Sequence, residues 1–181
     1  MSDTELAGRR ARILLVDDTA TDVELTLTAF EDAHLANDVA VARTGGEALD
    51  RLQGRTRNAD GTRPPLPDLI LLDLKMPGID GFEALRQIKA TPILRRIPLI
   101  VLTSSREEGD RAFSYDTGAN SYLVKPVSFE GFVDAVGKIL DYWLVLNVRP
   151  PLPTHLFEDE SVADDPVPAP ALPLAAPETS P

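Results

Sequence analysis

The chain has 181 residues, no cysteine, two histidines and a formal net charge of −11 at pH 7. The lack of cysteine excludes disulfides, thiolate zinc sites and cysteine nucleophiles, and the wide separation of His34 and His155 argues against a histidine-based metal site or triad. The acidic balance argues against a nucleic-acid-binding surface, and no apolar run is long enough to span a membrane. We therefore expect a cytoplasmic protein that binds neither nucleic acid nor membrane.

The composition of the chain changes toward its C-terminus. From Pro150 onward there are six acidic residues, no Lys or Arg, and nine of the sixteen prolines. A segment of this composition cannot bury enough apolar surface to fold. We predict a flexible N-terminus at residues 1–10, one folded domain at residues 11–148 and a disordered, acidic, Pro/Ala-rich tail at residues 149–181, with no output domain.

Five short apolar segments predict the strands of a parallel sheet. Each is continuous rather than alternating, which is typical of strands that are buried on both faces. In chain order they are Ile13–Val16, Val39–Ala42, Leu69–Leu72, Leu99–Leu102 and Tyr122–Val124.

Helix start signals lie between these strands. The segments Thr44–Glu47, Asp80–Glu83 and Ser105–Glu108 each have the spacing of a capping box, and Ser128 is a predicted cap of the last helix. Residues 54–67, rich in Gly, Pro and Arg, predict a loop. Strand and helix alternate five times, so the predicted fold is α/β, a flavodoxin-like, doubly wound, five-stranded parallel sheet with strand order 2-1-3-4-5.

Polar residues directly follow the strands. They are Asp17 and Asp18 after the first, Asp73 after the third, Thr103 after the fourth and Lys125 after the fifth. Because the carboxyl ends of parallel strands line one crevice where the winding reverses, we expect these side chains to converge. Clustered carboxylates repel one another, and Mg²⁺, which prefers oxygen ligands and binds phosphoryl groups, offsets that repulsion. The set therefore combines an acidic nucleophile, a metal site and two groups that bind a phosphoryl group.

The motifs around these residues resemble the response-regulator receiver family. They are ILLVDD at 13–18, LILLDLKMPGIDG at 69–81, IVLTSS at 100–105 and GANSYLVKPV at 118–127. They occur in order at the ends of the predicted strands, and the resemblance covers roughly residues 11–148. It implies a single-domain signalling protein of a two-component system, not an enzyme, that accepts phosphate from a sensor histidine kinase.

The resemblance also implies a role for each matching residue. Asp73 is the implied phosphoacceptor, and Thr103 and Lys125 are implied to bind the phosphoryl oxygens. The implied Mg²⁺ site is formed by Asp17, Asp18, Asp73 and the carbonyl group of Lys75.

Further family features map onto the second half of the chain. Tyr122 matches an aromatic switch that turns inward when Thr103 moves toward the phosphate, and Lys125–Pro126 matches the cis peptide of the family. The residues two positions after the acceptor and after the threonine, Lys75 and Ser105, match positions that vary in the family and tune the phosphoryl lifetime.

The C-terminal helix resembles a subgroup of the family. The sequence DYWLVLN at 141–147, and DDTATDVELT at 17–26, are similar to stand-alone regulators that are paired with phytochrome kinases, so the implied partner is a bacteriophytochrome-type kinase. Residues 142–148 leave almost no polar face on the helix, and a helix that is apolar all round must be covered. We expect a homodimer through this region; burial under the Pro-rich tail is the alternative.

A phosphatase and a receiver-like interaction module are the two alternatives to a phosphate-accepting receiver. A phosphatase with an aspartyl-phosphate intermediate needs a second aspartate two residues after the nucleophile, where this chain has Lys75 after Asp73 and Thr19 after Asp17. A receiver-like interaction module that never takes phosphate would lack one of the five strand-end residues, all of which are present.

Overall fold

The computed structural model describes residues 10–32, 37–76, 80–148 and 150. The predicted flexible N-terminus and the predicted disordered tail lie, apart from residues 10 and 150, outside the described residues, so both stay predictions.

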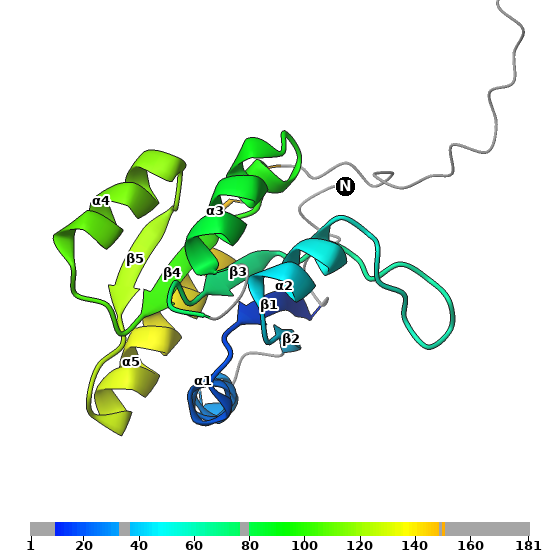
Figure 1. Ribbon diagram of the computed structural model, residues 1–181. Helices are drawn as coiled ribbons and strands as arrows, with labels where there is room; N and C mark the ends of the chain where they lie inside the picture. The colour runs from blue at the N-terminus through cyan, green and yellow to red at the C-terminus, as the bar shows by residue number, and fades with distance from the viewer. Residues whose placement is uncertain (1–9, 33–36, 77–79, 149, 151–181) are drawn as a thin grey trace, which may run out of the picture.

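Five parallel strands form one sheet in the order β2-β1-β3-β4-β5 (Figure 1). Strand β1 lies between β2 and β3 and pairs Val16 with Ala42 of β2 and with Leu72 of β3. All five predicted strands and the predicted strand order are therefore confirmed. The strands are β1 (Ala11–Val16), β2 (Asn37–Ala42), β3 (Leu69–Leu72), β4 (Leu99–Thr103) and β5 (Ser121–Val124).

Helices cover both faces of the sheet. Helices α1 and α5 lie on one face, and α2, α3 and α4 lie on the other (Figure 1). Within the described ranges, no helix is long and apolar enough to cross a membrane. The helices are α1 (Ala20–Asp32), α2 (Gly45–Leu52), α3 (Gly81–Ala90), α4 (Glu108–Thr117) and α5 (Phe129–Leu140), with a short 3₁₀ helix η2 (Leu94–Arg96) and a π-helical segment η3 (Asp141–Leu146) that continues α5.

The two-sided burial explains the continuous apolar strands. Successive side chains of a strand point to opposite faces, so in β3 Leu69 and Leu71 pack with α1 and α5, whereas Ile70 and Leu72 pack with α2 and α3. All four residues are fully buried. An alternating polar residue would be buried without a partner, which is why the strand is uniformly apolar.

Three of the predicted helix caps are confirmed. The side chains of Thr44, Asp80 and Ser128 accept hydrogen bonds from backbone N–H groups in the first turns of α2, α3 and α5. These bonds satisfy N–H groups that have no partner within the helix.

The predicted capping box at Ser105 is wrong. Helix α4 begins at Glu108, its N-cap is Glu107, and no side chain caps it. The Ser105 hydroxyl instead donates to a carboxylate oxygen of Asp110 at 2.5 Å. A hydrogen bond to an ionised acceptor is stronger than one between neutral groups, so the nearby carboxylate takes the place of the helix N–H as the partner of the serine.

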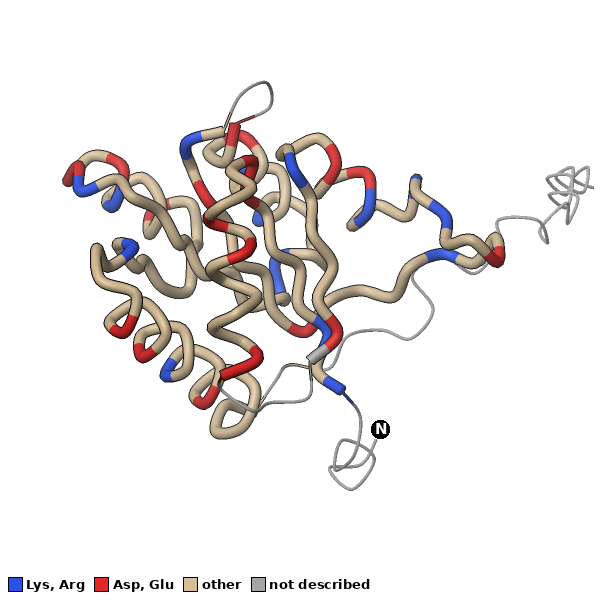
Figure 2. Tube along the Cα trace, turned by 90° about the horizontal axis from the view of Figure 1, so that it is seen from below, with Lys and Arg blue, Asp and Glu red and all other residues tan. Residues whose placement is uncertain are grey.

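The segment 54–67 is a loop, as predicted, and it projects from the body of the domain (Figures 1 and 2). Arg55 forms an ion pair of 2.6 Å with Asp50, and Arg57 donates to the Gly54 carbonyl oxygen at 2.6 Å. Toward its end the loop returns to the domain, where Leu66 packs against the core on the side of α2 and α3.

Gly81 packs against the backbone that carries Asp73. A Cβ atom at Gly81 would overlap the Asp73 carbonyl oxygen and lie 2.5 Å from Leu74 Cα. We predict that Gly81→Ala lowers the free energy of unfolding by about 1–3 kcal/mol or more, the usual cost of overpacking, as measured by urea denaturation.

Gly137 in α5 is the matched control, because a Cβ atom there meets nothing within 4 Å. Gly137→Ala is expected to raise the free energy of unfolding by about 0.5–1 kcal/mol, since alanine has less backbone freedom in the unfolded chain. A Gly81→Ala variant as stable as Gly137→Ala would contradict the packing argument.

Candidate functional site

Two neighbouring strands bring the acidic residues together. The Asp73 N–H donates to the Val16 carbonyl oxygen at 2.9 Å, which fixes the end of β3 beside the end of β1. Carboxylate oxygens of Asp17, Asp18 and Asp73 consequently all lie within 4.8 Å of one another. Asp17 and Asp73 are buried and Asp18 is exposed, so the cluster has one open side. The predicted acidic cluster forms at the predicted edge of the sheet.

Lys125 reaches into this cluster from β5. Its ammonium nitrogen lies 2.7 Å from Asp17 Oδ2 and 3.2 Å from Asp73 Oδ2, and its side chain is only 8% exposed. A third carboxylate, that of Asp22, lies 2.6 Å from the same nitrogen. One ammonium group therefore holds three carboxylates from different parts of the chain.

Asp22 was missed by the sequence reasoning. It lies in the first turn of α1, where an acidic residue is usual because it interacts favourably with the helix dipole. Its position shortly after Asp17 and Asp18 was the available signal, because the chain turns into α1 directly behind them.

The electrostatics of the cluster show an excess of negative charge. Burial raises the pKa of Asp17 above its usual value even though Lys125 acts in the opposite direction. Burial alone would lower the pKa of Lys125, but its hydrogen bonds to Asp17 and Asp22 outweigh this and raise it. Lys125 therefore stays protonated, and a single cation faces the carboxylates of Asp17, Asp18, Asp22 and Asp73. A divalent cation with oxygen ligands fits this donor set.

Thr103 and Tyr122 lie in β4 and β5, on the side of β3 opposite β1. Thr103 is buried at the end of β4, and its carbonyl oxygen accepts from the Lys125 N–H at 2.8 Å. Its hydroxyl accepts from the Ser105 N–H at 3.3 Å, and the Tyr122 hydroxyl donates to the Ser105 carbonyl oxygen at 3.1 Å. Both residues predicted to act in switching therefore contact the same loop residue after β4.

The Lys75 ammonium binds a carboxylate of α4. The Lys75 backbone N–H donates to Asp73 Oδ1 at 3.2 Å, but the ammonium nitrogen lies 3.0 Å from Asp110 Oδ2 in α4. The hydrogen bond from Ser105, together with Lys75, holds the pKa of the Asp110 carboxyl below its usual range.

The predicted cis peptide at Lys125–Pro126 is wrong. The described residues, which include both, contain no cis peptide bond. The trans form is favoured by about 0.5–1 kcal/mol before proline, and with this trans bond the Lys125 side chain still reaches Asp17.

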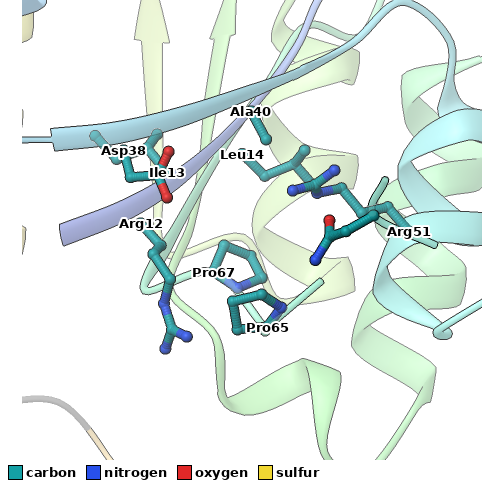
Figure 3. Close-up of a pocket in the computed structure, with 9 residues that line it drawn as sticks. Arg12, Ile13, Leu14, Asp38, Ala40, Arg51, Pro65 and Pro67 are labelled. Carbon is teal, nitrogen blue, oxygen red and sulfur yellow. The ribbon is translucent and has the colours of Figure 1, made fainter. Parts of the chain in front are cut away.

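A separate cavity lies at the opposite ends of the strands. It has a volume of about 270 Å³ and is lined by residues that include Arg12, Asp38 and Arg51, with Pro65 and Pro67 forming one wall (Figure 3). None of its lining residues belongs to the acidic cluster, and Arg12 lies at the start of β1 whereas Asp17 follows its end. The cavity is not the site of the predicted chemistry.

The site thus consists of clustered carboxylates, a buried ammonium and a strand-end hydroxyl at the carboxyl edge of a doubly wound sheet, and its carboxylates fit a divalent cation. The chain belongs to the response regulator receiver domain family, whose model matches residues 13–137. The general function of this family is phosphorylation-dependent signalling in two-component systems.

Single-domain regulators are among its relatives. The chain is 41% identical over 138 residues to the probable methanogenesis regulatory protein FilR2 of Methanothrix harundinacea, covering 76% of this chain and 86% of that protein. It is 36% identical over 132 residues to the response regulator Rcp1 of a Synechocystis species, covering 73% and 88%.

Solved structures show the same fold. The phosphorylated cyanobacterial phytochrome response regulator RcpA is 36% identical with a TM-score of 0.72, covering 79% of this chain and 100% of that one. The Mn²⁺-bound form of Rcp1 is 35% identical with a TM-score of 0.70, covering 78% and 99%. The stand-alone phytochrome-associated regulators are thus homologues of this chain.

Removal of the Lys125 ammonium is the first test of the site. Lys125→Met leaves Asp17 and Asp73 buried without their cation, and it should lower the free energy of unfolding at pH 7 by about 3–5 kcal/mol, as breaking a buried ion pair does. Without the ammonium the folded-state pKa of Asp17, already above 3.8, rises further. The loss is therefore present at neutral pH and shrinks as the pH falls through that folded-state pKa.

Lys138→Met is the control, because that lysine is 75% exposed and pairs with Asp134 one helical turn away. Such a surface pair contributes about 0.3–0.5 kcal/mol. Chemical denaturation of both variants from pH 7 to pH 4 measures the difference, and equal losses that do not vary with pH would contradict the role of Lys125.

Proposed function

We propose that this protein is a cytoplasmic response regulator that accepts phosphate on Asp73 from a sensor histidine kinase and signals through a phosphorylation-dependent change in protein contacts. The observation that carries the proposal is the position of the Asp73 carboxylate, which lies within 4.8 Å of those of Asp17 and Asp18 and 3.2 Å from the Lys125 ammonium. A buried carboxylate that is positioned by an ammonium group, and that lies beside other carboxylates able to bind a metal ion, is suited to act as a nucleophile.

The proposed metal is Mg²⁺, held by Asp17, Asp18, Asp73 and the carbonyl group of Lys75. Its support is the purely carboxylate cluster with one open side and the metal-bound form of Rcp1. When bound, the cation supplies positive charge to the oxygens of the transferring phosphoryl group.

The residues of the chain have the following proposed roles in the transfer. An Asp73 carboxylate oxygen forms a bond to phosphorus while the bond from phosphorus to the histidine nitrogen of the kinase breaks, and the imidazole leaves. Lys125 remains protonated and binds a phosphoryl oxygen. The Thr103 hydroxyl turns its proton toward the phosphoryl group while its oxygen keeps the Ser105 N–H.

The phosphatase alternative gains no support from the structure. The position two residues after Asp73 holds Lys75, whose ammonium is bound to Asp110, and the one after Asp17 holds Thr19, whose N–H donates to Asp17 Oδ1 at 2.9 Å. Neither residue is a carboxylic acid that could transfer protons during turnover. We propose that the protein is a phosphoacceptor and not an enzyme.

The proposed kinase is of the bacteriophytochrome type. Its support is the similarity to the phytochrome response regulator RcpA over 79% of this chain. The similarity extends past Leu140, the end of α5, because 79% of 181 residues is about 143 residues, so that even an alignment beginning at residue 1 would end beyond that helix.

The proposed assembly is a homodimer through the C-terminal helix region. The η3 segment and the residues after it expose four large apolar side chains, Tyr142 (51%), Val145 (62%), Leu146 (72%) and Val148 (87%). Several exposed apolar side chains within one short segment are typical of an interaction site. A second copy of the chain would cover it with the same surface.

Phosphorylation can be tested with acetyl phosphate. Wild-type protein with Mg²⁺ is expected to form one phosphoryl adduct that is labile to alkali and hydroxylamine, seen by intact-mass spectrometry, and to form none when EDTA is added beforehand. Asp73→Asn should abolish the adduct, because an amide nitrogen or oxygen is a much poorer nucleophile than a carboxylate. Asp116→Asn, at an exposed position on α4, should leave it unchanged, and an adduct retained in Asp73→Asn would overturn the assignment.

The homodimer can be tested by light scattering coupled to size exclusion. Wild-type protein should have the mass of two chains, and the double variant Val145→Asp, Leu146→Asp should have the mass of one, because two buried carboxylates have no partners at the seam. Tyr115→Asp, at a side chain 50% exposed on α4, is the matched control and should stay dimeric. A monomeric wild type would contradict the proposal.

A further inference from the structure

A group of three side chains links the loop that carries Asp73 to the loop after β4. Asp110 Oδ2 accepts from the Lys75 ammonium at 3.0 Å and from the Ser105 hydroxyl at 2.5 Å. We call this group of Lys75, Ser105 and Asp110 the Asp110 clamp. Because both donors share one carboxylate oxygen, a change in one bond of the clamp alters the other.

Ser105 connects the clamp to both switching residues. Its N–H donates to the Thr103 hydroxyl at 3.3 Å, and its carbonyl oxygen accepts from the Tyr122 hydroxyl at 3.1 Å. Its three polar groups are thus bonded to Asp110, Thr103 and Tyr122. A movement of the Asp110 carboxylate consequently reaches Tyr122 through one residue.

Lys75 is the member of the clamp that is free to move. Its side chain is 47% exposed, and its ammonium lies 5.5 Å from the centre of the Phe82 ring. Asp110, by contrast, has a side chain only 13% exposed. An exposed ion pair contributes little and breaks easily, so Lys75 can exchange a partner at small cost.

Phosphorylation provides a competing partner. A phosphoryl group carries a charge of about −1.5 to −2 at pH 7, more than the carboxylate that it replaces. Lys125 is already bonded to the carboxylates of Asp17, Asp22 and Asp73. Lys75, whose N–H is 3.2 Å from Asp73 Oδ1, is attached next to the acceptor.

We propose that Lys75 exchanges partners on phosphorylation, leaving Asp110 for the phosphoryl oxygens on Asp73, and that Asp110 is the positioning residue that holds Lys75 and Ser105 in the unphosphorylated arrangement. The exchange frees the Asp110 carboxylate, loosens Ser105 and thereby releases the Tyr122 hydroxyl. This inference rests on the proposed function of Asp73, and it adds a second connection from the acceptor to Tyr122 beside that through Thr103.

The exchange makes a prediction for the binding of a phosphoryl analogue. A group that binds one conformation better shifts the equilibrium toward it, and the coupling is reciprocal. Asp110→Asn weakens the clamp, so beryllofluoride with Mg²⁺ should bind this variant about two- to fivefold more tightly than wild type, the range of an exposed ion pair. Lys75→Met removes the phosphoryl contact as well and should bind it more weakly than wild type.

The double variant tests whether the tighter binding of beryllofluoride expected for Asp110→Asn depends on Lys75. If Lys75 exchanges partners, Lys75→Met with Asp110→Asn should bind beryllofluoride like Lys75→Met alone. If Asp110→Asn merely loosened the loop, the gain would persist without Lys75, and the proposal would be overturned. Glu108→Gln is the control on the same helix, because that side chain is 92% exposed and contacts Arg111 instead; it should leave the affinity unchanged.

The binding measurements, and the outcomes in which a variant does not fold or the wild type does not bind, also test the proposed exchange. Titration followed by the fluorescence of Trp143 or by amide NMR shifts gives the affinity, and the amide of Ser105 should shift in Asp110→Asn without any ligand. If Asp110→Asn fails to fold, Lys75→Met decides alone, and tighter or unchanged binding in that variant overturns the exchange. Failure of the wild type to bind overturns the proposed function with it, whereas wild-type binding with no effect of any clamp variant overturns the exchange only.

Discussion

The structure depends on one buried ammonium group. Lys125 lies within 3.2 Å of the carboxylates of Asp17, Asp22 and Asp73, and so joins the ends of β1, β3 and β5 with the first turn of α1. Burying charges is costly unless they are paired, and the two buried carboxylates of this cluster, Asp17 and Asp73, share the same cation. Among the described residues the cluster still has more carboxylates than cations, and this imbalance favours the binding of a further cation.

The sheet makes this arrangement possible because its apolar core and its charged site lie in different parts of the strands. The segments Ile13–Val16, Leu69–Leu72 and Leu99–Leu102 of β1, β3 and β4 are apolar and buried. The polar residues of the site lie at or just after the carboxyl ends of the strands, in the crevice at which the winding direction reverses. Charge can therefore change at that edge without an unpaired group appearing in the core.

The loop after β4 connects the carboxyl end of the sheet to α4 and to Tyr122. Ser105 is bonded to Thr103, Asp110 and Tyr122, so the buried strand end, α4 and the half-buried tyrosine meet at a single residue. Hydrogen bonds that share one residue form and break together more readily than isolated ones. The position of Ser105 thus depends on which partners Thr103 and Asp110 hold.

The sequence by itself determined the sheet, its strand order and the convergence of Asp17, Asp18, Asp73 and Lys125, because burial on both faces and the direction of parallel strands are properties of the local pattern. The tertiary structure alone decided which partners the long side chains take. Asp22 joined the cluster, Lys75 and Ser105 turned to a carboxylate of α4, and the Lys125–Pro126 bond was trans. Each of these outcomes depends on distances between elements far apart in the chain, which no local spacing encodes.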